Sequence, residues 1–228
     1  ITTQPLSSEV CLDGTAEDLT VGYTGGAGTV TYQWYQNSSN SKTGATLISG
    51  ATSTTYTPLT NIESVSYYYV ELTFASSGCG SIASDIARVS VVGQLEVAAV
   101  PVTETICVGG SASEFSVSYT KGLGTASYQW YTNTVDSNTG GTPIFGAVFN
   151  TYQPDVFTST GRYYYYVEVS LNGVGCTSSN SDVYEVEVVA DPVIDSEPIS
   201  TQSLCVGGTP TDVSVSISGG VASSMNYQ

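Results

Sequence analysis

Residues 31–35 read Thr-Tyr-Gln-Trp-Tyr, and residues 127–131 read Ser-Tyr-Gln-Trp-Tyr. In an extended chain alternate side chains share a face, so Tyr32 lies on the same face as Trp34, and Tyr128 on the same face as Trp130. Trp34 and Trp130 are 96 positions apart (130 − 34). Two near-identical strand segments at this distance predict tandem copies of one domain.

The five cysteines follow the same period. Cys11 and Cys107 are 96 positions apart (107 − 11), Cys79 and Cys176 are 97 apart (176 − 79), and Cys205 opens a third copy. The third copy ends at Asn-Tyr-Gln, where the first two continue into the tryptophan, so we expect a longer tandem array. The predicted domains are a first repeat at residues 1–93, a second at 94–190 and the start of a third at 191–228.

Strand signals fill each repeat. Apolar and polar residues alternate over residues 19–23 and 115–119, and segments rich in tyrosine and valine follow at 67–74 and 163–170. No segment has sustained helical periodicity. About seven short strands per repeat, with a tryptophan on the third, predict an all-β chain of tandem immunoglobulin-like β-sandwich domains joined head to tail.

The predicted core is aromatic. Trp34 and Trp130 occupy the place of the core tryptophan of an immunoglobulin domain. Tyr68 and Tyr165 stand where that fold has the second cysteine of its inter-sheet disulfide. We therefore expect these four side chains to pack in the two cores without that disulfide.

The composition disfavours several functions. The formal charge is −16, with four Lys+Arg against twenty Asp+Glu, so we expect no nucleic-acid partner. No apolar run approaches the roughly 20 residues of a membrane helix, and we predict no direct membrane insertion. The chain has no histidine, which excludes a Ser-His-Asp or Cys-His nucleophile, and its carboxylates are scattered. We therefore predict that it is not an enzyme.

Cysteines that recur once per repeat, with no CxxC pair, are typical of disulfides in an oxidising, extracellular setting. Two pairings remain open. Within repeats, the pairs are Cys11–Cys79 and Cys107–Cys176. In the second pairing, Cys11 bonds Cys176 across the junction of two repeats. The turn near Cys11 and the turn that holds Cys79 lie at opposite ends of one sandwich, about 26 Å apart, whereas a disulfide spans only about 4.4–6.8 Å between Cα atoms. Cys79, Cys107 and Cys205 then pair with other repeats.

Two kinds of ligand site are considered. Asp85 and Asp182 each follow a serine, six positions after a cysteine, and are candidate Ca²⁺ ligands; the alternative is solvated surface acids. Outward-facing tyrosines could form a stripe that stacks on sugars, or could simply form cross-strand pairs. These tyrosines are Tyr67, Tyr69, Tyr164 and Tyr166. The polar loops 37–44 and 133–141 are alternative contact sites.

Taken together, the Cys-x-Gly at residues 107–109, the Tyr-Gln-Trp-Tyr strand, the Tyr-Tyr-Tyr-Val strand and the closing Gly-Cys resemble a known family. They are similar to the tandem Ig-like or PKD-like repeats of giant cell-surface proteins in gliding Bacteroidetes, including gliding-motility adhesins. The resemblance covers the whole chain and implies a cell-surface location and type IX secretion.

The function expected from this resemblance is that of non-catalytic stalk or spacer repeats in a large secreted adhesin, serving gliding motility or surface attachment. The alternatives are a glycan-binding module, as an adhesin tip or an accessory domain of a secreted hydrolase, and a subunit of an extracellular filament. The expected partners are neighbouring repeats of the chain, surface polysaccharide and the outer-membrane motility or secretion machinery.

Overall fold

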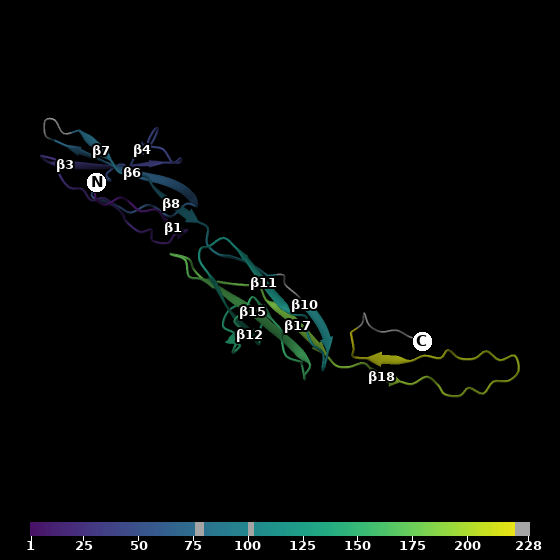
Figure 1. The fold of residues 1–228 in the computed structure, drawn as a ribbon. Coiled ribbons are helices and arrows are strands. Elements are labelled where there is room, and N and C mark those ends of the chain that lie inside the picture. The colour runs from purple at the N-terminus through teal and green to yellow at the C-terminus, as the bar shows by residue number, and fades with distance from the viewer. Residues whose placement is uncertain (76–79, 100–102, 222–228) are drawn as a thin grey trace. The chain divides into compact units, whose positions relative to one another are not determined.

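The computed structural model describes residues 1–75, 80–99 and 103–221 (Figure 1). Every regular element in these ranges is a β-strand, and they contain no helix long and apolar enough to cross a membrane. The chain divides into two compact units. Unit 1 comprises Ile1–Val97, Tyr119–Ser127 and Val169–Ser179, and unit 2 comprises Ala98–Ser118, Tyr128–Glu168 and Asn180–Gln228. Unit 1 therefore contains the first repeat together with two turn regions of the second.

The first repeat is a two-layer sandwich. Its larger sheet has the order β1-β8-β6-β3-β4, in which β1 runs parallel to β8, and β7 also pairs with β6. The smaller layer pairs β2 with β5, and a bridge joins Thr3 to Gly22. The strands are β1 Ser8–Cys11, β2 Leu19–Thr20, β3 Val30–Asn37, β4 Thr46–Leu47, β5 Thr55–Tyr56, β6 Ser64–Phe74, β7 Ser81–Ala83 and β8 Ala87–Val92.

The second repeat has the same topology. Its larger sheet has the order β10-β17-β15-β12-β13, with β16 also paired to β15, and its smaller sheet is β14-β11-β9. Its strands are β9 Glu96–Ala99, β10 Thr103–Cys107, β11 Phe115–Thr120, β12 Ala126–Asn133, β13 Thr142–Pro143, β14 Thr151–Tyr152, β15 Gly161–Leu171, β16 Ser179–Asn180 and β17 Tyr184–Val189. The third repeat contributes β18 Val193–Ser196 and β19 Ser216–Ser218.

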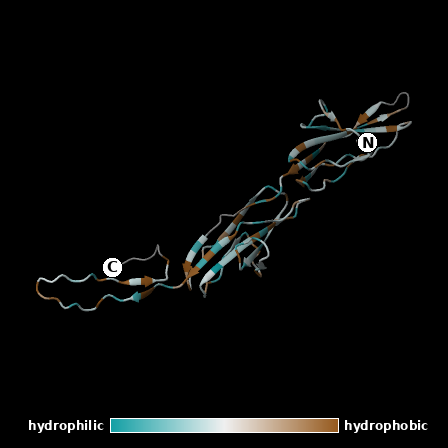
Figure 2. Ribbon diagram, turned by 180° about the vertical axis from the view of Figure 1, so that it is seen from behind, coloured by the Kyte–Doolittle hydropathy of each residue, from teal (hydrophilic) through white to brown (hydrophobic). Residues whose placement is uncertain are grey.

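The strand order is that of tandem immunoglobulin-like β-sandwich domains, as the repeat pattern predicts. Residues 19–23 were expected to form one strand, but β2 contains only Leu19–Thr20, because Gly22 pairs with Thr3 instead of extending the pairing with β5. Buried and more exposed residues alternate along β6 and β17, and Figure 2 shows bands of differing hydropathy along the strands.

The two cores are built on the predicted aromatic residues. Trp34 and Trp130 are fully buried, and Tyr68 and Tyr165 are also buried. Each indole N–H donates a hydrogen bond of 2.9 Å to a main-chain carbonyl, from Trp34 to Ser53 and from Trp130 to Phe149. The buried indole N–H is thereby satisfied, and the bond also holds the loop that contains Ser53 or Phe149 against the core.

A serine interrupts the last strand of each sandwich. Between the pairs Tyr68–Ala87 and Glu71–Ala83, two residues of β6 face three residues of the opposite strand, which is a β-bulge. The buried Ser84 Oγ accepts a hydrogen bond from Val70 N (3.1 Å) and donates one to Asp85 O (2.8 Å). Ser181 makes the equivalent bonds with Val167 N and Asp182 O in the second repeat. The hydroxyl thus satisfies a strand N–H that the bulge leaves without its ladder partner.

Candidate functional site at the junction of the repeats

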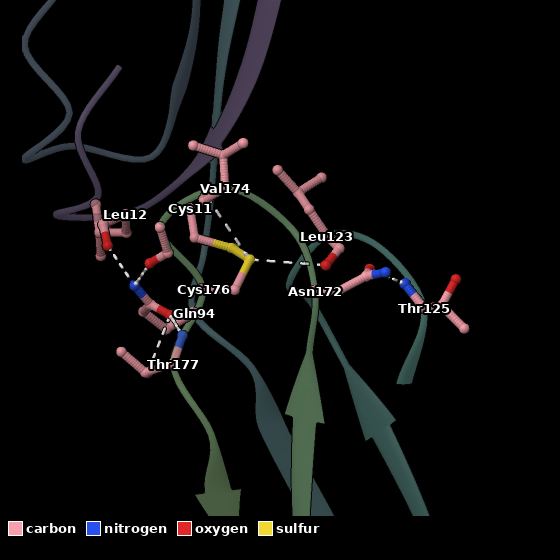
Figure 3. Close-up of a disulfide and its surroundings, with 10 residues drawn as sticks. Cys11, Leu12, Gln94, Leu123, Thr125, Asn172, Val174, Cys176 and Thr177 are labelled. Carbon is pink, nitrogen blue, oxygen red and sulfur yellow. Dashed lines mark hydrogen bonds between the residues drawn. A yellow bond between two sulfur atoms is a disulfide. The ribbon is translucent and has the colours of Figure 1, made fainter. Parts of the chain in front are cut away.

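Cys11 and Cys176 form a disulfide inside unit 1 (Figure 3). Cys11 ends β1 of the first repeat, and Cys176 lies in the turn after β15 of the second. Their Cα atoms are 5.0 Å apart, although 165 positions separate them in the sequence. The Cys11 N–H also donates to Val174 O at 2.9 Å, so the bonded turn is held by its main chain as well.

The disulfide decides between the two pairings left open by the sequence. The within-repeat pairs Cys11–Cys79 and Cys107–Cys176 are not formed, because each would use a sulfur that is already bonded. Cys79 lies outside the described residues. In the described part of the chain, Cys107 is a half-buried free thiol and Cys205 an exposed one.

Two glycines allow the turns around the disulfide to approach closely. A Cβ atom built on Gly14 would lie 2.6 Å from the Cα of Gly175. Gly175 also has a positive φ of 73°, a conformation that favours glycine. Any larger residue at either position would force the two turns apart.

Gln94 ties both turns to the end of the first repeat (Figure 3). Its Nε2 donates to Leu12 O (2.5 Å) and to Gly175 O (3.1 Å), while its Oε1 accepts from the main-chain N (3.0 Å) and the Oγ1 (3.2 Å) of Thr177. One amide therefore satisfies groups of both repeats.

The residues around Gln94 continue the contact. Gly93 O accepts a hydrogen bond of 3.0 Å from Gly122 N, and Leu95 is buried. Lys121, beside Gly122, has a positive φ of 60° and forms ion pairs with Glu96 (2.7 Å) and Glu63 (3.9 Å). The hydrogen bond to Glu96 raises the pKa of Lys121.

Position 121 shows how this site differs from its copies. The corresponding residues of the first and third repeats are Gly25 (φ 80°) and Gly219 (φ 72°), so glycine is the residue that the turn itself favours. A lysine in this conformation costs backbone energy, and here it places an ammonium group between two carboxylates. Comparing the repeats position by position would have identified Lys121. Gly14 also leaves a sequence signal, since Gly110 and Gly208 recur three positions after Cys107 and Cys205, whereas the role of Gln94 leaves none.

Part of this junction recurs further along the chain. Gly220 N donates to Ala190 O at 2.7 Å, as Gly122 N does to Gly93 O.

The turn at Cys107 also has the same backbone hydrogen bonds as the turn at Cys11. Val108 N donates to Val189 O (3.0 Å) and Gly110 N to Cys107 O (3.0 Å); the counterparts are Leu12 N to Val92 O (2.7 Å) and Gly14 N to Cys11 O (2.9 Å). Cys107 is therefore presented in the same backbone setting as the bonded Cys11.

The predicted tyrosine stripe is largely engaged within the domains. Tyr69 stacks on Tyr35 (ring centroids 5.0 Å apart, 8° between planes), and Tyr166 stacks on Tyr131 (4.9 Å, 3°). Tyr166 lies on the opposite face of the sheet from the core residue Tyr165, as alternation predicts, but it is only 4% exposed, because the polar loop covers it and Gly141 N donates to its hydroxyl at 3.1 Å. Tyr67 and Tyr164 are half-buried.

The candidate calcium ligands are not gathered into a cluster. Asp85 and Asp182 are exposed, and the described residues contain no group of three or more His, Cys, Asp or Glu side chains placed to hold a metal ion. The bulge explains why the serine recurs, since its hydroxyl bonds the strand N–H and the next main-chain carbonyl; nothing in the structure explains why that next residue is an aspartate.

A family model matches residues 2–93 and again residues 98–190; its description is Domain of unknown function (DUF8696). The chain belongs to this family. It therefore carries two consecutive DUF8696 domains, and the Cys11–Cys176 bond joins one to the other. None of the curated proteins matches the chain.

Solved structures with tandem domains are similar to this DUF8696 chain at low identity. Sidekick-1 immunoglobulin domains 1–4 share 15% identity, over 96% of this chain and 56% of that one, with a TM-score of 0.42. The N-terminal eight Ig domains of Down Syndrome Cell Adhesion Molecule share 15% identity, over 87% of this chain and 26% of that one, with a TM-score of 0.36. The fibronectin(III)-like modules of Clostridium thermocellum CbhA share 11%, over 82% and 92%, with a TM-score of 0.34.

Proposed function

We propose that this chain is a non-catalytic stalk or spacer segment of a large secreted cell-surface adhesin, built to transmit force. The observation that supports this most is the Cys11–Cys176 disulfide, which bridges 165 positions and encloses most of both sandwiches in one covalent loop. Tension applied at the two ends of the chain passes through the disulfide. Residues 12–175 then carry no load along their backbone.

This arrangement suits a structure that must transmit force. An ordinary sandwich domain under tension unfolds and lengthens by about 3.3–3.6 Å for each residue released. The enclosed domains of this chain are protected from such lengthening as long as the bond is intact. The hydrogen bonds of Gln94 and the ion pairs of Lys121 add contacts at the junction that oppose bending.

The remaining cysteines extend the same scheme. Cys107 occupies the turn that corresponds to the Cys11 turn, and Gly208 N donates to Cys205 O (2.8 Å) as Gly14 N does to Cys11 O. In this proposal each of these thiols bonds the Gly-Cys turn of the following repeat, and Cys79 bonds a preceding one. Successive covalent loops would then overlap along the stalk.

The chemistry of the chain supports an extracellular location. Disulfides form and persist in oxidising compartments, and a surface with a formal charge of −16 resists association with anionic polymers and membranes. On the resemblance to gliding Bacteroidetes adhesins, we propose that the stalk serves gliding motility or attachment and is exported by the type IX route. Its partners are then its neighbouring repeats, surface polysaccharide and the outer-membrane motility or secretion machinery.

The size of the intact protein tests this function. Protein is sheared from the surface of the cells that make it and run on a denaturing gel with and without reductant, and its bands are identified by peptides of this sequence. A stalk predicts a band of several hundred kilodaltons in the reduced lane. A protein of only a few domains would overturn the stalk. A small band that appears only after reduction would indicate a filament of disulfide-linked subunits.

A further inference from the structure

The second repeat exposes an apolar patch that the first repeat lacks. Phe145, Val148 and Phe149 lie between β13 and β14, and their side chains are 104%, 48% and 69% exposed. We call these three residues the turn patch. The three fall within five consecutive residues of one turn. Exposed large apolar groups gathered on a surface commonly mark binding sites.

The fold does not require the turn patch. At the corresponding positions the first repeat has Ser49, Thr52 and Ser53, all exposed. The backbone hydrogen bonds are nevertheless the same in both repeats. Ala147 N donates to Ile144 O at 3.2 Å, as Ala51 N does to Ile48 O, and Val148 N donates to Gly146 O at 3.0 Å, as Thr52 N does to Gly50 O. One backbone thus carries hydroxyl side chains in the first repeat and apolar ones in the second.

The turn patch stands on a rigid base. The indole of the buried Trp130 donates to Phe149 O at 2.9 Å, and Trp130 N donates to Ala147 O at 3.0 Å. Gly146 has a φ of 78°, which a tight turn of this kind needs at its third residue. The two phenyl rings are therefore presented on a backbone fixed by the core, and little backbone freedom is lost when a ligand binds.

The size of the turn patch favours a small ligand over a protein. Each phenylalanine can bury at most about 150–250 Å², so two rings and one valine fall well below the roughly 800 Å² that each partner of a stable protein complex buries. A second copy of the chain would also bring together two surfaces that each carry a formal charge of −16. The turn patch is sufficient to cover one or two sugar rings.

The charge around the turn patch favours a neutral ligand. Between Asp136 and Asp155 the chain carries no charged side chain, and the rest of the protein is strongly acidic. An anionic polymer would be repelled by the net charge of the protein and would find no cation in this segment. The exposed Asn150 and Thr142 lie on either side of the turn patch in the sequence and can hydrogen-bond to sugar hydroxyls.

We propose that the turn patch binds a neutral oligosaccharide, with the phenyl rings against the C–H faces of the sugar. This site is additional to the stalk role and does not depend on it, because it needs only the second sandwich. Unlike Tyr69 and Tyr166, whose rings stack on Tyr35 and Tyr131, these phenyl rings are exposed.

Binding is measured on the whole 228-residue chain. The probes are soluble neutral polysaccharides (α- and β-glucans, xylan, mannan and galactan) in affinity gel electrophoresis, followed by calorimetry with the hexasaccharide of any polysaccharide that retards the protein. The loss variant is Phe145→Ser with Phe149→Ser, which installs the residues of the first repeat on the same backbone. The gain variant is Ser49→Phe with Thr52→Val and Ser53→Phe. Leu59→Ser, at another exposed apolar residue, is the control.

The proposal predicts retardation by at least one neutral polysaccharide, an association constant about tenfold or more lower in the loss variant, and a second site in the gain variant. Leu59→Ser should bind as the parent does. Failure of every neutral polysaccharide to retard the parent chain would overturn the proposal. So would dimerisation in sedimentation analysis that only the loss variant abolishes, because the turn patch would then be an interface between copies. Neither result would affect the stalk, which the mass of the native protein tests separately.

Discussion

Gly14 and Gly175 meet backbone to backbone: a Cβ atom on Gly175 would lie 2.5 Å from the Cα of Gly14. The two glycines belong to different DUF8696 domains and flank the disulfide that joins those domains. The covalent bond therefore depends on a non-covalent fit that only glycine permits.

Substitution of Gly14 by alanine should weaken this junction. We expect Gly14→Ala to cost about 1–3 kcal/mol through overpacking and to slow the closure of the Cys11–Cys176 bond during oxidative refolding. Gly110→Ala is the matched control. Its Cβ would meet Cys107 O at 2.9 Å, as a Cβ on Gly14 meets Cys11 O at 2.9 Å, but it meets no residue of another repeat. Equal effects of the two substitutions on melting and on bond closure would show that only the turn, not the junction, needs the glycine.

The buried serines should matter more than the aspartates that follow them. Ser181→Ala removes the acceptor of Val167 N inside the sandwich, so we expect a loss of about 1–3 kcal/mol in the free energy of unfolding. Asp182→Asn keeps the main-chain carbonyl that accepts from Ser181 and should change stability by less than about 0.5 kcal/mol. Urea unfolding measures both. A calcium-dependent rise in stability that Asp182→Asn removes would instead identify the carboxylate as a metal ligand.

The second repeat should lose stability at high pH. Burial raises the pKa of Tyr165 and that of Tyr184 to about 12, whereas an exposed tyrosine titrates near 10. The unfolded chain therefore releases these protons first as the pH rises, and the free energy of unfolding should fall between about pH 10 and pH 12. Denaturant titrations at several pH values test this. Tyr165→Phe should flatten the slope, and a free energy that is constant across this interval would contradict the assignment.

The sequence predicted those parts of the fold that repeat or alternate. Trp34 and Trp130 could be predicted as core residues, because they recur at the period of the repeat and alternation along their strands puts both on the face that points into the sandwich. The disulfide could be narrowed to two pairings because strand length limits what a cysteine at the end of a sandwich can reach.

The contacts that single side chains make across the junction could not be predicted. Gln94 reaches four polar groups that no pattern connects, and Lys121 adopts a backbone conformation that propensity assigns to glycine. The burial of Tyr166 could not be predicted, because alternation along β15 gives the face of its ring but does not reveal the loop that covers it. The turn patch could be recognised only by comparing the two repeats residue by residue, since a phenylalanine in a single sequence is normally predicted to be a core residue.

In the proposed stalk, the disulfide removes residues 12–175 from the path of force. A single-molecule force experiment can test this by pulling the 228-residue chain from its two ends, before and after reduction. The oxidised chain should show no step long enough to release the enclosed residues, because only strands outside the loop, such as β1 and β17, can be pulled out. The reduced chain, or Cys11→Ser, should show two further steps that together release roughly 500–600 Å, the length of the 165-position loop at about 3.3–3.6 Å per residue. Two full-length unfolding steps in the oxidised chain would contradict the account.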